Sequence, residues 1–376
     1  MPLRKGLGVV SEKQMRPLVP DYIANLTAYP PGKPIEEVER EYGIKGSIKL
    51  ASNENPLGPS PKAVEAIKNH VSTLHRYPDG SCYYLKEKLA ERLGIPKNRI
   101  ILGNGSNEII ELIVRAFLRP GDEAVMAHPA FIVYQMIVQA AGGKNVILPL
   151  KEFTHDLEAM AGAITGKTRL VFITNPNNPT GTIVKRDEFE MFLKRVPEDV
   201  IVVMDEAYFE YVSDPEYPNG MDYINDRLVV SLRTFSKIYG LAGLRIGYGV
   251  ASEEIINYLE KVRQPFNVNS LAQVAAMAAL DDQGHVEKSV SINSDGLSYL
   301  YGELDGMGLS YVKSQANFLL IDMKGDCAKI YQELMKKGVI VRPMGIYNLN
   351  NYLRITVGLP EENKRFIEAL KIFYQG

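Results

Sequence analysis

From residue 60 to about residue 275, segments with helical hydrophobic periodicity alternate with short runs of consecutive apolar residues. A run that is apolar at every position predicts a strand buried on both faces. Because helix-length segments separate the runs, we expect a mostly parallel sheet covered by helices on both sides. The predicted strands occupy residues 123–127, 145–150, 170–174, 200–204, 228–232 and 246–250.

The pattern changes after an alanine-rich segment at 262–280, which is expected to be helical. We place a boundary between two lobes within or just after this segment. Beyond it, three strand-like runs and one helical segment predict a smaller α/β lobe, at 317–321, 339–342 and 352–357 for the strands and 327–337 for the helix. The first fifty residues are rich in proline and glycine and predict an extended arm. The expected organisation is an arm at 1–49, a large domain at 50–275 and a small C-terminal domain at 276–376.

Composition narrows the class of protein. The length of 376 residues suits two domains, or one large domain with a smaller lobe. Hydrophobic residues make up 45% and charged residues 23%, as is ordinary for a soluble globular enzyme. A net charge of -2 gives no electrostatic reason to expect nucleic acid or a membrane surface as a partner.

The rarer residues add further expectations. Cys82 and Cys327 lie far apart and form no CxxC pair, which favours a reduced, cytoplasmic protein without disulfides. No apolar run is long enough for a signal peptide or a membrane helix. The five histidines show no ligand-like spacing, so no metal site is expected.

Two motifs resemble nucleotide-binding sequences without their context. Residues 161–168 resemble a phosphate-binding P-loop ending at Lys167, but a helical segment precedes them and a strand follows, which is the reverse of a P-loop. An ATP-dependent enzyme using Lys167 is therefore the weaker alternative; it would bind Mg²⁺-ATP. Residues 103–108 begin like a dinucleotide fingerprint, but Glu108 stands where the third glycine belongs.

The most informative segment runs from residue 231 to residue 245. Lys237 lies beside Thr234 and Ser236, and Arg245 follows after several small residues. A lysine amine can condense with an aldehyde, while hydroxyls and a guanidinium can bind a phosphate on the same molecule. The alternative is an exposed lysine in a glycine-rich loop.

Two other segments add possible ligands for such a molecule. Small residues before the amphipathic segment 108–118 leave backbone amides free to bind an anion, unless Ser106 or Asn107 caps the helix. The sequence Asn-Pro-Asn-Asn-Pro-Thr-Gly at 175–181 predicts a rigid turn at the carboxyl end of a buried strand. Asn178 in this turn can present its amide to a ring hydroxyl, although the segment can also be a turn without a ligand.

An acid follows the apolar run at 200–204. Asp205 is either in contact with solvent or a buried carboxylate that requires a partner. A protonated pyridine nitrogen is such a partner, and Tyr208 can donate to a phenolic oxygen of the same ring. An acid that binds Mg²⁺ is the alternative, but it lacks a credible P-loop beside it.

Together these motifs resemble the fold-type I aminotransferases that use pyridoxal 5'-phosphate, over nearly the whole chain. The resemblance rests on NPNNPTG, on DEAY at 205–208 and on the SKxxGLxGLR pattern that begins at Ser236. It implies a large domain with a mostly parallel sheet between helices, and a smaller α/β C-terminal lobe. Lys237 matches the lysine that forms a Schiff base with the cofactor and moves the proton.

The same resemblance assigns the remaining ligands of the cofactor. Asp205 matches the partner of the pyridine nitrogen, and Asn178 and Tyr208 match the ligands of the ring oxygen. Phe131 falls where an aromatic residue, often tyrosine, stacks on the ring. The matches to the phosphate ligands are Thr234, Ser236 and Arg245 through side chains and Ser106 and Asn107 through backbone amides.

Tyr77, in Arg-Tyr-Pro, resembles a tyrosine that reaches the cofactor phosphate of the neighbouring subunit. This resemblance implies a homodimer with shared active sites.

Three further segments resemble histidinol-phosphate aminotransferases: residues 28–34, residues 50–56, and residues 339–343 with 352–358. The resemblance implies transfer of an amino group between glutamate or 2-oxoglutarate and histidinol phosphate or imidazole-acetol phosphate, in histidine biosynthesis. Arg354 and Arg342 can bind the phosphate or carboxylates of these substrates, although either can also form a surface ion pair. Tyr29 can close over the substrate, and Asn53 is a further candidate ligand.

Other functions on the same scaffold stay open at this point. An aromatic amino-acid aminotransferase and a threonine-phosphate decarboxylase share the chemistry and differ in a few side chains of the substrate pocket. A non-enzymatic binding protein is disfavoured because all the catalytic positions are filled.

Overall fold

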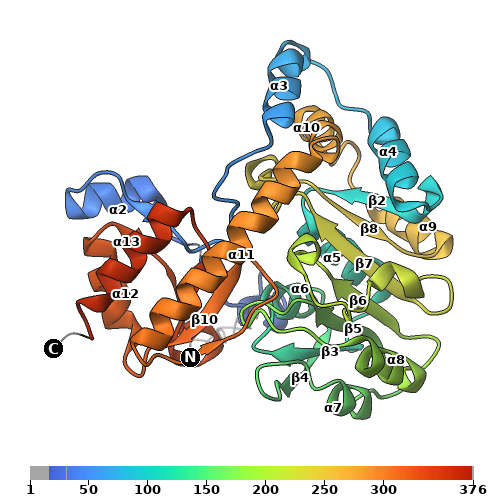
Figure 1. The fold of residues 1–376 in the computed structure, drawn as a ribbon. Helices are drawn as coiled ribbons and strands as arrows, with labels where there is room; N and C mark the ends of the chain where they lie inside the picture. Colours follow the sequence, from blue (N-terminus) through green and yellow to red (C-terminus); the bar gives the residue numbers. More distant parts are fainter. Residues whose placement is uncertain (1–16, 31, 375–376) are drawn as a thin grey trace, which may run out of the picture.

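The computed structural model describes residues 17–30 and 32–374. The start of the chain, on which the expectation of no signal peptide partly rests, lies outside these residues. Figure 1 shows two lobes, and the long helix α11 (Gln283–Gly306) runs from beside α10 (Ser270–Leu280) of the large lobe to the small lobe. The expected boundaries at residues 49/50 and 275/276 stay a prediction.

The large lobe is built on a seven-stranded sheet with the order β2-β8-β7-β6-β5-β3-β4. Only β8 runs antiparallel to its neighbours, so the predicted mostly parallel sheet is confirmed. The strands are β2 (Ile100–Gly103), β3 (Glu123–His128), β4 (Lys144–Pro149), β5 (Thr168–Thr174), β6 (Ile201–Asp205), β7 (Val229–Thr234) and β8 (Gly247–Val250).

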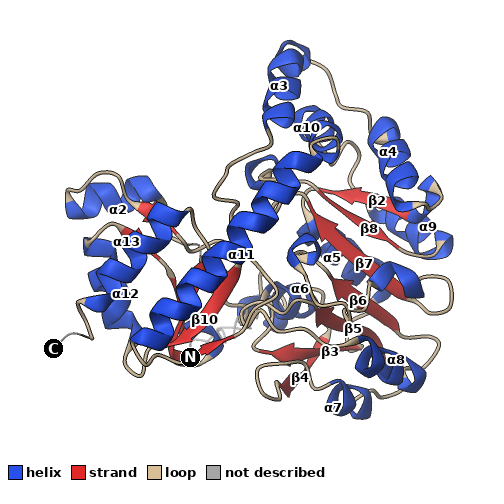
Figure 2. Cartoon of the chain, in the orientation of Figure 1, coloured by secondary structure: helices blue, strands red, loops and turns tan. Residues whose placement is uncertain are grey.

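Helices cover both faces of this sheet (Figure 2). Alternate residues of each strand enter different hydrophobic clusters, because successive side chains of a strand point to opposite faces. On β6, for example, Val203 packs in the cluster of α5, α6 and α9, whereas Val202 packs in the cluster of α4, α7, α8 and α10. The bounds are α4 (Tyr83–Leu93), α5 (Ser106–Phe117), α6 (Val133–Ala140), α7 (Leu157–Gly162), α8 (Arg186–Arg195) and α9 (Glu253–Val262).

The prediction of a helix over 262–280 is wrong for its first part. Helix α9 ends at Val262, residues 263–269 are not helical, and α10 begins at Ser270. Pro265 lacks a backbone N–H and disfavours helical geometry in the residue before it. Asn269 then caps α10, since its side chain accepts a hydrogen bond of 2.8 Å from the amide of Ala272.

The small lobe contains an antiparallel sheet with the order β12-β13-β10-β9, packed against α12 and α13. The run expected as one strand at 339–342 divides into β11, which pairs elsewhere, and β12. The bounds are β9 (Tyr311–Val312), β10 (Phe318–Asp322), β11 (Val339–Ile340), β12 (Arg342–Met344), β13 (Leu349–Thr356), α12 (Cys327–Lys336) and α13 (Pro360–Lys371).

Part of the segment expected to be an extended arm is packed onto the small lobe. Helix α2 (Ile35–Tyr42) places Val38 against Met335 and Ile340, and β1 (Ile48–Lys49) pairs in parallel with β11. The small lobe is therefore completed by a segment from near the start of the chain. The other N-terminal helices are α1 (Asp21–Ala24) and α3 (Pro61–His70).

Three adjacent strands end in polar side chains at one edge of the large sheet. Thr174 ends β5, Asp205 ends β6 and Thr234 ends β7. The carboxyl edge of an open parallel sheet is where ligands bind. Among the helices of residues 17–30 and 32–374, none is both long and apolar enough to cross a membrane.

Candidate active site

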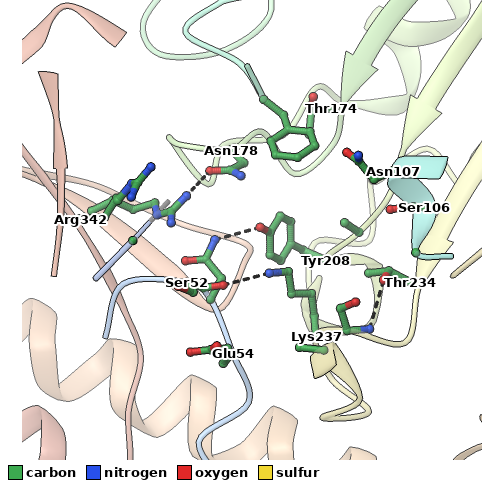
Figure 3. A pocket seen from close by; sticks show the side chains of 18 of the residues that line it. Ser52, Glu54, Ser106, Asn107, Thr174, Asn178, Tyr208, Thr234, Lys237 and Arg342 are labelled. Atoms are coloured by element: carbon green, nitrogen blue, oxygen red, sulfur yellow. Dashed lines mark hydrogen bonds between the residues drawn. The ribbon is translucent and has the colours of Figure 1, made fainter. Parts of the chain in front are cut away.

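A cavity of about 320 Å³ lies at the carboxyl edge of the large sheet and is lined by residues of both lobes. Figure 3 shows Arg342 and Asn178 at one end, Ser106, Asn107 and Thr234 at the other, and Lys237 and Tyr208 between them. All but one of the residues predicted from the sequence line it: Tyr29, Asn53, Ser106, Asn107, Phe131, Asn178, Asp205, Tyr208, Thr234, Ser236, Lys237, Arg245, Arg342 and Arg354.

Lys237 follows β7 and projects into this cavity. Its Nζ donates a hydrogen bond of 3.1 Å to the backbone oxygen of Ser52 and lies 5.6 Å from the centre of the Tyr208 ring. Burial, reinforced by the nearby charge of Arg354, lowers the pKa of Lys237 to about 8. A substantial share of the amine is therefore neutral near pH 8, as a nucleophile or a general base requires.

Asp205 presents one oxygen without a partner. Its side chain is buried, and Oδ2 accepts a hydrogen bond of 2.6 Å from the hydroxyl of Tyr134. Oδ1 is also buried and has no hydrogen-bond partner among the residues that the structure describes. Burial raises the pKa of Asp205 to about 6. A buried carboxylate oxygen of this kind is stabilised by a charged donor, and the protonated nitrogen of a pyridine ring fits that requirement.

Tyr208 is held by Asn53. The side-chain amide of Asn53 donates a hydrogen bond of 2.9 Å to the Tyr208 hydroxyl, and the backbone amide of Asn53 donates to Oγ1 of Thr356 at 2.8 Å. Burial raises the pKa of Tyr208 to about 12, so the phenol keeps its proton. The hydroxyl accepts from Asn53 and can donate its own proton into the cavity.

The start of helix α5 is a candidate anion site. Its N-cap is Gly105, with a φ of 78° and no side-chain cap, so the alternative in which Ser106 or Asn107 caps the helix is wrong. The amides of the first turn have no partner within a helix, and they favour an anion. The guanidinium of Arg245 approaches so closely that a methyl group on Gly105 would lie 2.5 Å from its Nη2. Thr234 and Ser236 line the same end of the cavity.

Two arginines occupy the opposite end. Arg342 on β12 and Arg354 on β13 are directly paired across the two strands. Arg354 donates to Oδ1 of Asn178 and, at 2.7 Å, to the backbone oxygen of Ala51, while Arg342 donates at 2.9 Å to the backbone oxygen of Pro30. Like charges opposite each other in a sheet repel, so an anionic ligand would stabilise this pair.

The alternative of a surface ion pair fails for Arg354. Its side chain is buried, and it makes no ion pair within residues 17–30 and 32–374. Its Nε is buried without a hydrogen-bond partner there, and its two Nη atoms use only two of the five N–H donors of the guanidinium, so donors remain for a ligand.

Comparison with known proteins identifies the family. Residues 45–370 match the family model for class I and II aminotransferases. The chain belongs to this family.

Named relatives of this aminotransferase narrow the resemblance. This chain is 52% identical over 351 residues to a histidinol-phosphate aminotransferase of Moorella thermoacetica. The aligned region covers 93% of this chain and 91% of the relative. A histidinol-phosphate aminotransferase of Caldicellulosiruptor saccharolyticus is 49% identical, over 93% of this chain and 98% of the relative. The resemblance to histidinol-phosphate aminotransferases is thereby confirmed.

A solved structure agrees. The histidinol-phosphate aminotransferase of Sinorhizobium meliloti, crystallised in complex with pyridoxal 5'-phosphate, superposes with a TM-score of 0.87 at 28% identity. The match covers 96% of this chain and 99% of the other. The fold-type I architecture predicted from the sequence is confirmed.

Tyr77 is the predicted residue that does not line the cavity of this aminotransferase. It is 84% exposed, and its ring stacks on Phe266 with centroids 4.9 Å apart. The predicted role requires a second subunit, so it stays a prediction.

The sequence did not point to several residues that shape the site. Tyr134 and Thr174 form a hydrogen-bonded chain with Asp205. The backbone oxygen of Ser52 accepts a hydrogen bond from Lys237. Tyr134 lies in the first turn of α6, three residues after Phe131, and this short separation was the available signal. Ser52 acts through the main chain, which no side-chain pattern encodes.

The P-loop interpretation is wrong. Lys167 is exposed in the turn between α7 and β5, so the order is helix, turn and strand, and Lys167 does not line the cavity. Within the described part of the chain, no group of three or more His, Cys, Asp or Glu side chains is placed to hold a metal ion.

Proposed function

We propose that this chain transfers an amino group between glutamate or 2-oxoglutarate and histidinol phosphate or imidazole-acetol phosphate, with pyridoxal 5'-phosphate as cofactor. The names of its relatives support the reaction. The observation that carries the proposal is that a single cavity contains Lys237, the unpaired oxygen of Asp205 and two arginines.

The cofactor would lie between the start of α5 and the sheet edge. When bound, it supplies an aldehyde that receives the amino group and a ring that withdraws electrons. Lys237 would hold it at the aldehyde carbon, and Asp205 at the ring nitrogen. Because Arg354 occupies Oδ1 of Asn178, the Nδ2 group of Asn178 is the end available to the ring oxygen, beside the hydroxyl of Tyr208. Phe131 would stack on the ring.

The phosphate would lie at the anion site of α5. Ser106 and Asn107 offer backbone amides there, and the side chains around it belong to Thr234, Ser236 and Arg245.

Substrate anions would bind at the opposite end. Arg354 and Arg342 can hold the phosphate of histidinol phosphate or a carboxylate of glutamate, because a guanidinium binds either group through two donors. Tyr29, which is 46% exposed beside Arg342, would cover the bound substrate and exclude water.

Lys237 would also move the proton at the substrate α-carbon. Its lowered pKa allows the amine to accept a proton in one half of the reaction and return it in the other.

Replacement of Lys237 tests the mechanism. Lys237→Ala is expected to abolish transamination and the yellow absorbance, and borohydride should trap cofactor on the Lys237 peptide of the native chain alone. Lys167→Ala is the matched control and should keep full activity, since Lys167 lies outside the cavity. Unchanged turnover in Lys237→Ala would refute the mechanism.

Substrate choice is tested by single-turnover spectroscopy. The yellow protein is mixed separately with histidinol phosphate, glutamate, phenylalanine and tyrosine, and the loss of yellow absorbance is followed. We expect histidinol phosphate and glutamate to react fastest. Much faster reaction with the aromatic amino acids would instead indicate an aromatic aminotransferase.

A homodimer completes the proposal, in a reducing cytoplasm where the two buried cysteines stay free thiols. Several large apolar side chains are exposed on the segment around Tyr77, and such patches mark protein interfaces. On that segment they are Val71, Leu74, Tyr83 and Tyr84, and Phe266, whose ring stacks on Tyr77, is also exposed. In this dimer, Tyr77 would reach the cofactor phosphate of the partner.

A further inference from the structure

The two oxygens of Asp205 have different surroundings, and Tyr134 accounts for the difference. The Tyr134 hydroxyl donates to Oδ2 at 2.6 Å, whereas Oδ1 is buried without a partner in the described part of the chain. A carboxylate can rotate about its Cβ–Cγ bond, so a bond to one oxygen determines where the other lies.

The direction of the hydrogen bonds is defined by the available protons. A phenol has a single proton, and Tyr134 gives it to Asp205. Oγ1 of Thr174 lies 2.9 Å from the same phenol oxygen and must therefore be the donor in that contact. Burial and the charge of Asp205 raise the pKa of Tyr134 well above its usual value, so the phenol stays a donor.

The ring of Tyr134 is fixed as firmly as its hydroxyl. It is buried, stacks on Phe172 of β5 with centroids 4.8 Å apart and planes 10° apart, and meets the edge of Phe131 at 5.5 Å and 85°. Phe172 and Phe131 thus hold the ring of Tyr134, which does not itself line the cavity.

We propose that Tyr134 is a positioning residue that fixes the Asp205 carboxylate so that Oδ1 is the oxygen offered to the ring nitrogen of the cofactor. The inference rests on the proposed function, because it requires pyridoxal phosphate in the cavity. It assigns no contact between Tyr134 and the cofactor itself.

Tyr134→Phe tests the inference, since it keeps the ring and removes the donor. In cofactor-free protein we expect the affinity for pyridoxal phosphate, measured by equilibrium dialysis, to fall about tenfold to hundredfold, as for the loss of one hydrogen bond to a charged group. Tyr217→Phe is the matched control. Tyr217 is also buried but does not line the cavity, and its hydroxyl lies 2.5 Å from the backbone oxygen of Asn175 and 3.0 Å from Oε1 of Glu206, next to Asp205. The affinity of Tyr217→Phe for pyridoxal phosphate should stay within about twofold of the native value.

A second ligand separates positioning from general damage. An analogue of pyridoxal phosphate with carbon in place of the ring nitrogen cannot pair with Oδ1. If Tyr134 acts through Asp205, Tyr134→Phe and the native chain should bind this analogue equally well. The inference is overturned if Tyr134→Phe binds pyridoxal phosphate as tightly as the native chain, or loses the same factor for both ligands.

Two further variants apply if Tyr134→Phe does not fold. Tyr134→Gln keeps a donor and Tyr134→Met does not, at similar size, and we expect the glutamine variant to bind pyridoxal phosphate more tightly. Equal affinities would overturn the inference. If the native chain binds no pyridoxal phosphate, the proposed function fails and this inference fails with it, which is a different result from a variant that binds normally.

Discussion

At the scale of single residues, the site places a lysine where a positive charge is disfavoured. Lys237 lies near Arg354 in a buried position, and both effects lower its pKa to about 8. Positions of this kind are common in active sites, which sacrifice stability for reactivity.

Removal of this charge should stabilise the cofactor-free protein. Folding lowers the pKa of Lys237 from 10.5 to about 8, so below pH 8 the folded state is destabilised by the whole cost of keeping the buried amine protonated. This destabilisation decreases as the pH rises from 8 toward 10.5, because the amine loses its proton. We expect Lys237→Met to raise the free energy of unfolding by about 1–3 kcal/mol at pH 7 and by clearly less at pH 9.5. Urea unfolding of both proteins at the two pH values measures this, and a gain that grows with pH would contradict it.

Residues with a distinctive chemical pattern were predictable and the supporting residues were not. Asp205 ends a strand, and Lys237 and Asn178 follow strands that end at the same sheet edge; the structure brings all three into one cavity. Tyr134 reaches the site through a buried contact between a helix and a strand. A sequence alone does not define that contact, since it depends on how two elements pack.

At the scale of elements, three glycines, Gly103, Gly105 and Gly247, let β8, β2 and the start of α5 pack closely together. Gly247 of β8 lies opposite Gly103, and a methyl group on Gly247 would lie 2.4 Å from the amide nitrogen of Ser106. These contacts involve backbone, which cannot move aside as a side chain can. The position of the α5 start, where we propose that the phosphate binds, therefore depends on a glycine in a neighbouring strand.

Gly247→Ala should displace the start of α5. We expect the affinity for pyridoxal phosphate to fall by about tenfold or more, while that for pyridoxal, which lacks the phosphate, changes little. Gly302→Ala on an exposed turn of α11 is the control, because its methyl group meets nothing within 4 Å, and it should stabilise the protein by about 0.5–1 kcal/mol. Equal losses for both ligands in Gly247→Ala would refute a specific effect on the phosphate end.

Strands of the large sheet were easier to predict than the segments around them. A buried strand leaves an unbroken apolar run, so the six predicted strands agree with observed strands within a few residues, whereas the short strand β2 was not among them. The alanine-rich composition led us to predict one helix over 262–280, across Pro265. The structure has no helix at 263–269, because proline disfavours helical geometry there. Helix α2 was missed because its many charged residues and flanking prolines resembled an arm.

At the scale of the whole molecule, the proposed dimer makes a sharp prediction. If Tyr77 serves the partner's site, a mixture of inactive Lys237→Ala and Tyr77→Ala chains should regain activity. Hybrid dimers contain one intact site, so random reassociation after mild unfolding should restore about a quarter of the native activity.

The control is a mixture of Lys237→Ala chains and Asn178→Ala chains. Asn178 lines the same cavity as Lys237 of its own chain, so neither site of a hybrid is intact and activity should stay absent. If the mixture of Lys237→Ala and Tyr77→Ala chains stays inactive although ultracentrifugation shows dimers, Tyr77 does not serve the partner's site.

The parallel pairing of β1 with β11 joins Ile48 to Val339 and Lys49 to Ile340. As a ribosome releases the chain from its N-terminus, β1 emerges early and its partner emerges close to the end. The large sheet can assemble during synthesis, whereas the early segment stays unpaired until translation is almost complete. A nascent chain halted before residue 339 would therefore leave Val38 without its packing partner Ile340, and protease should cut it within residues 35–49.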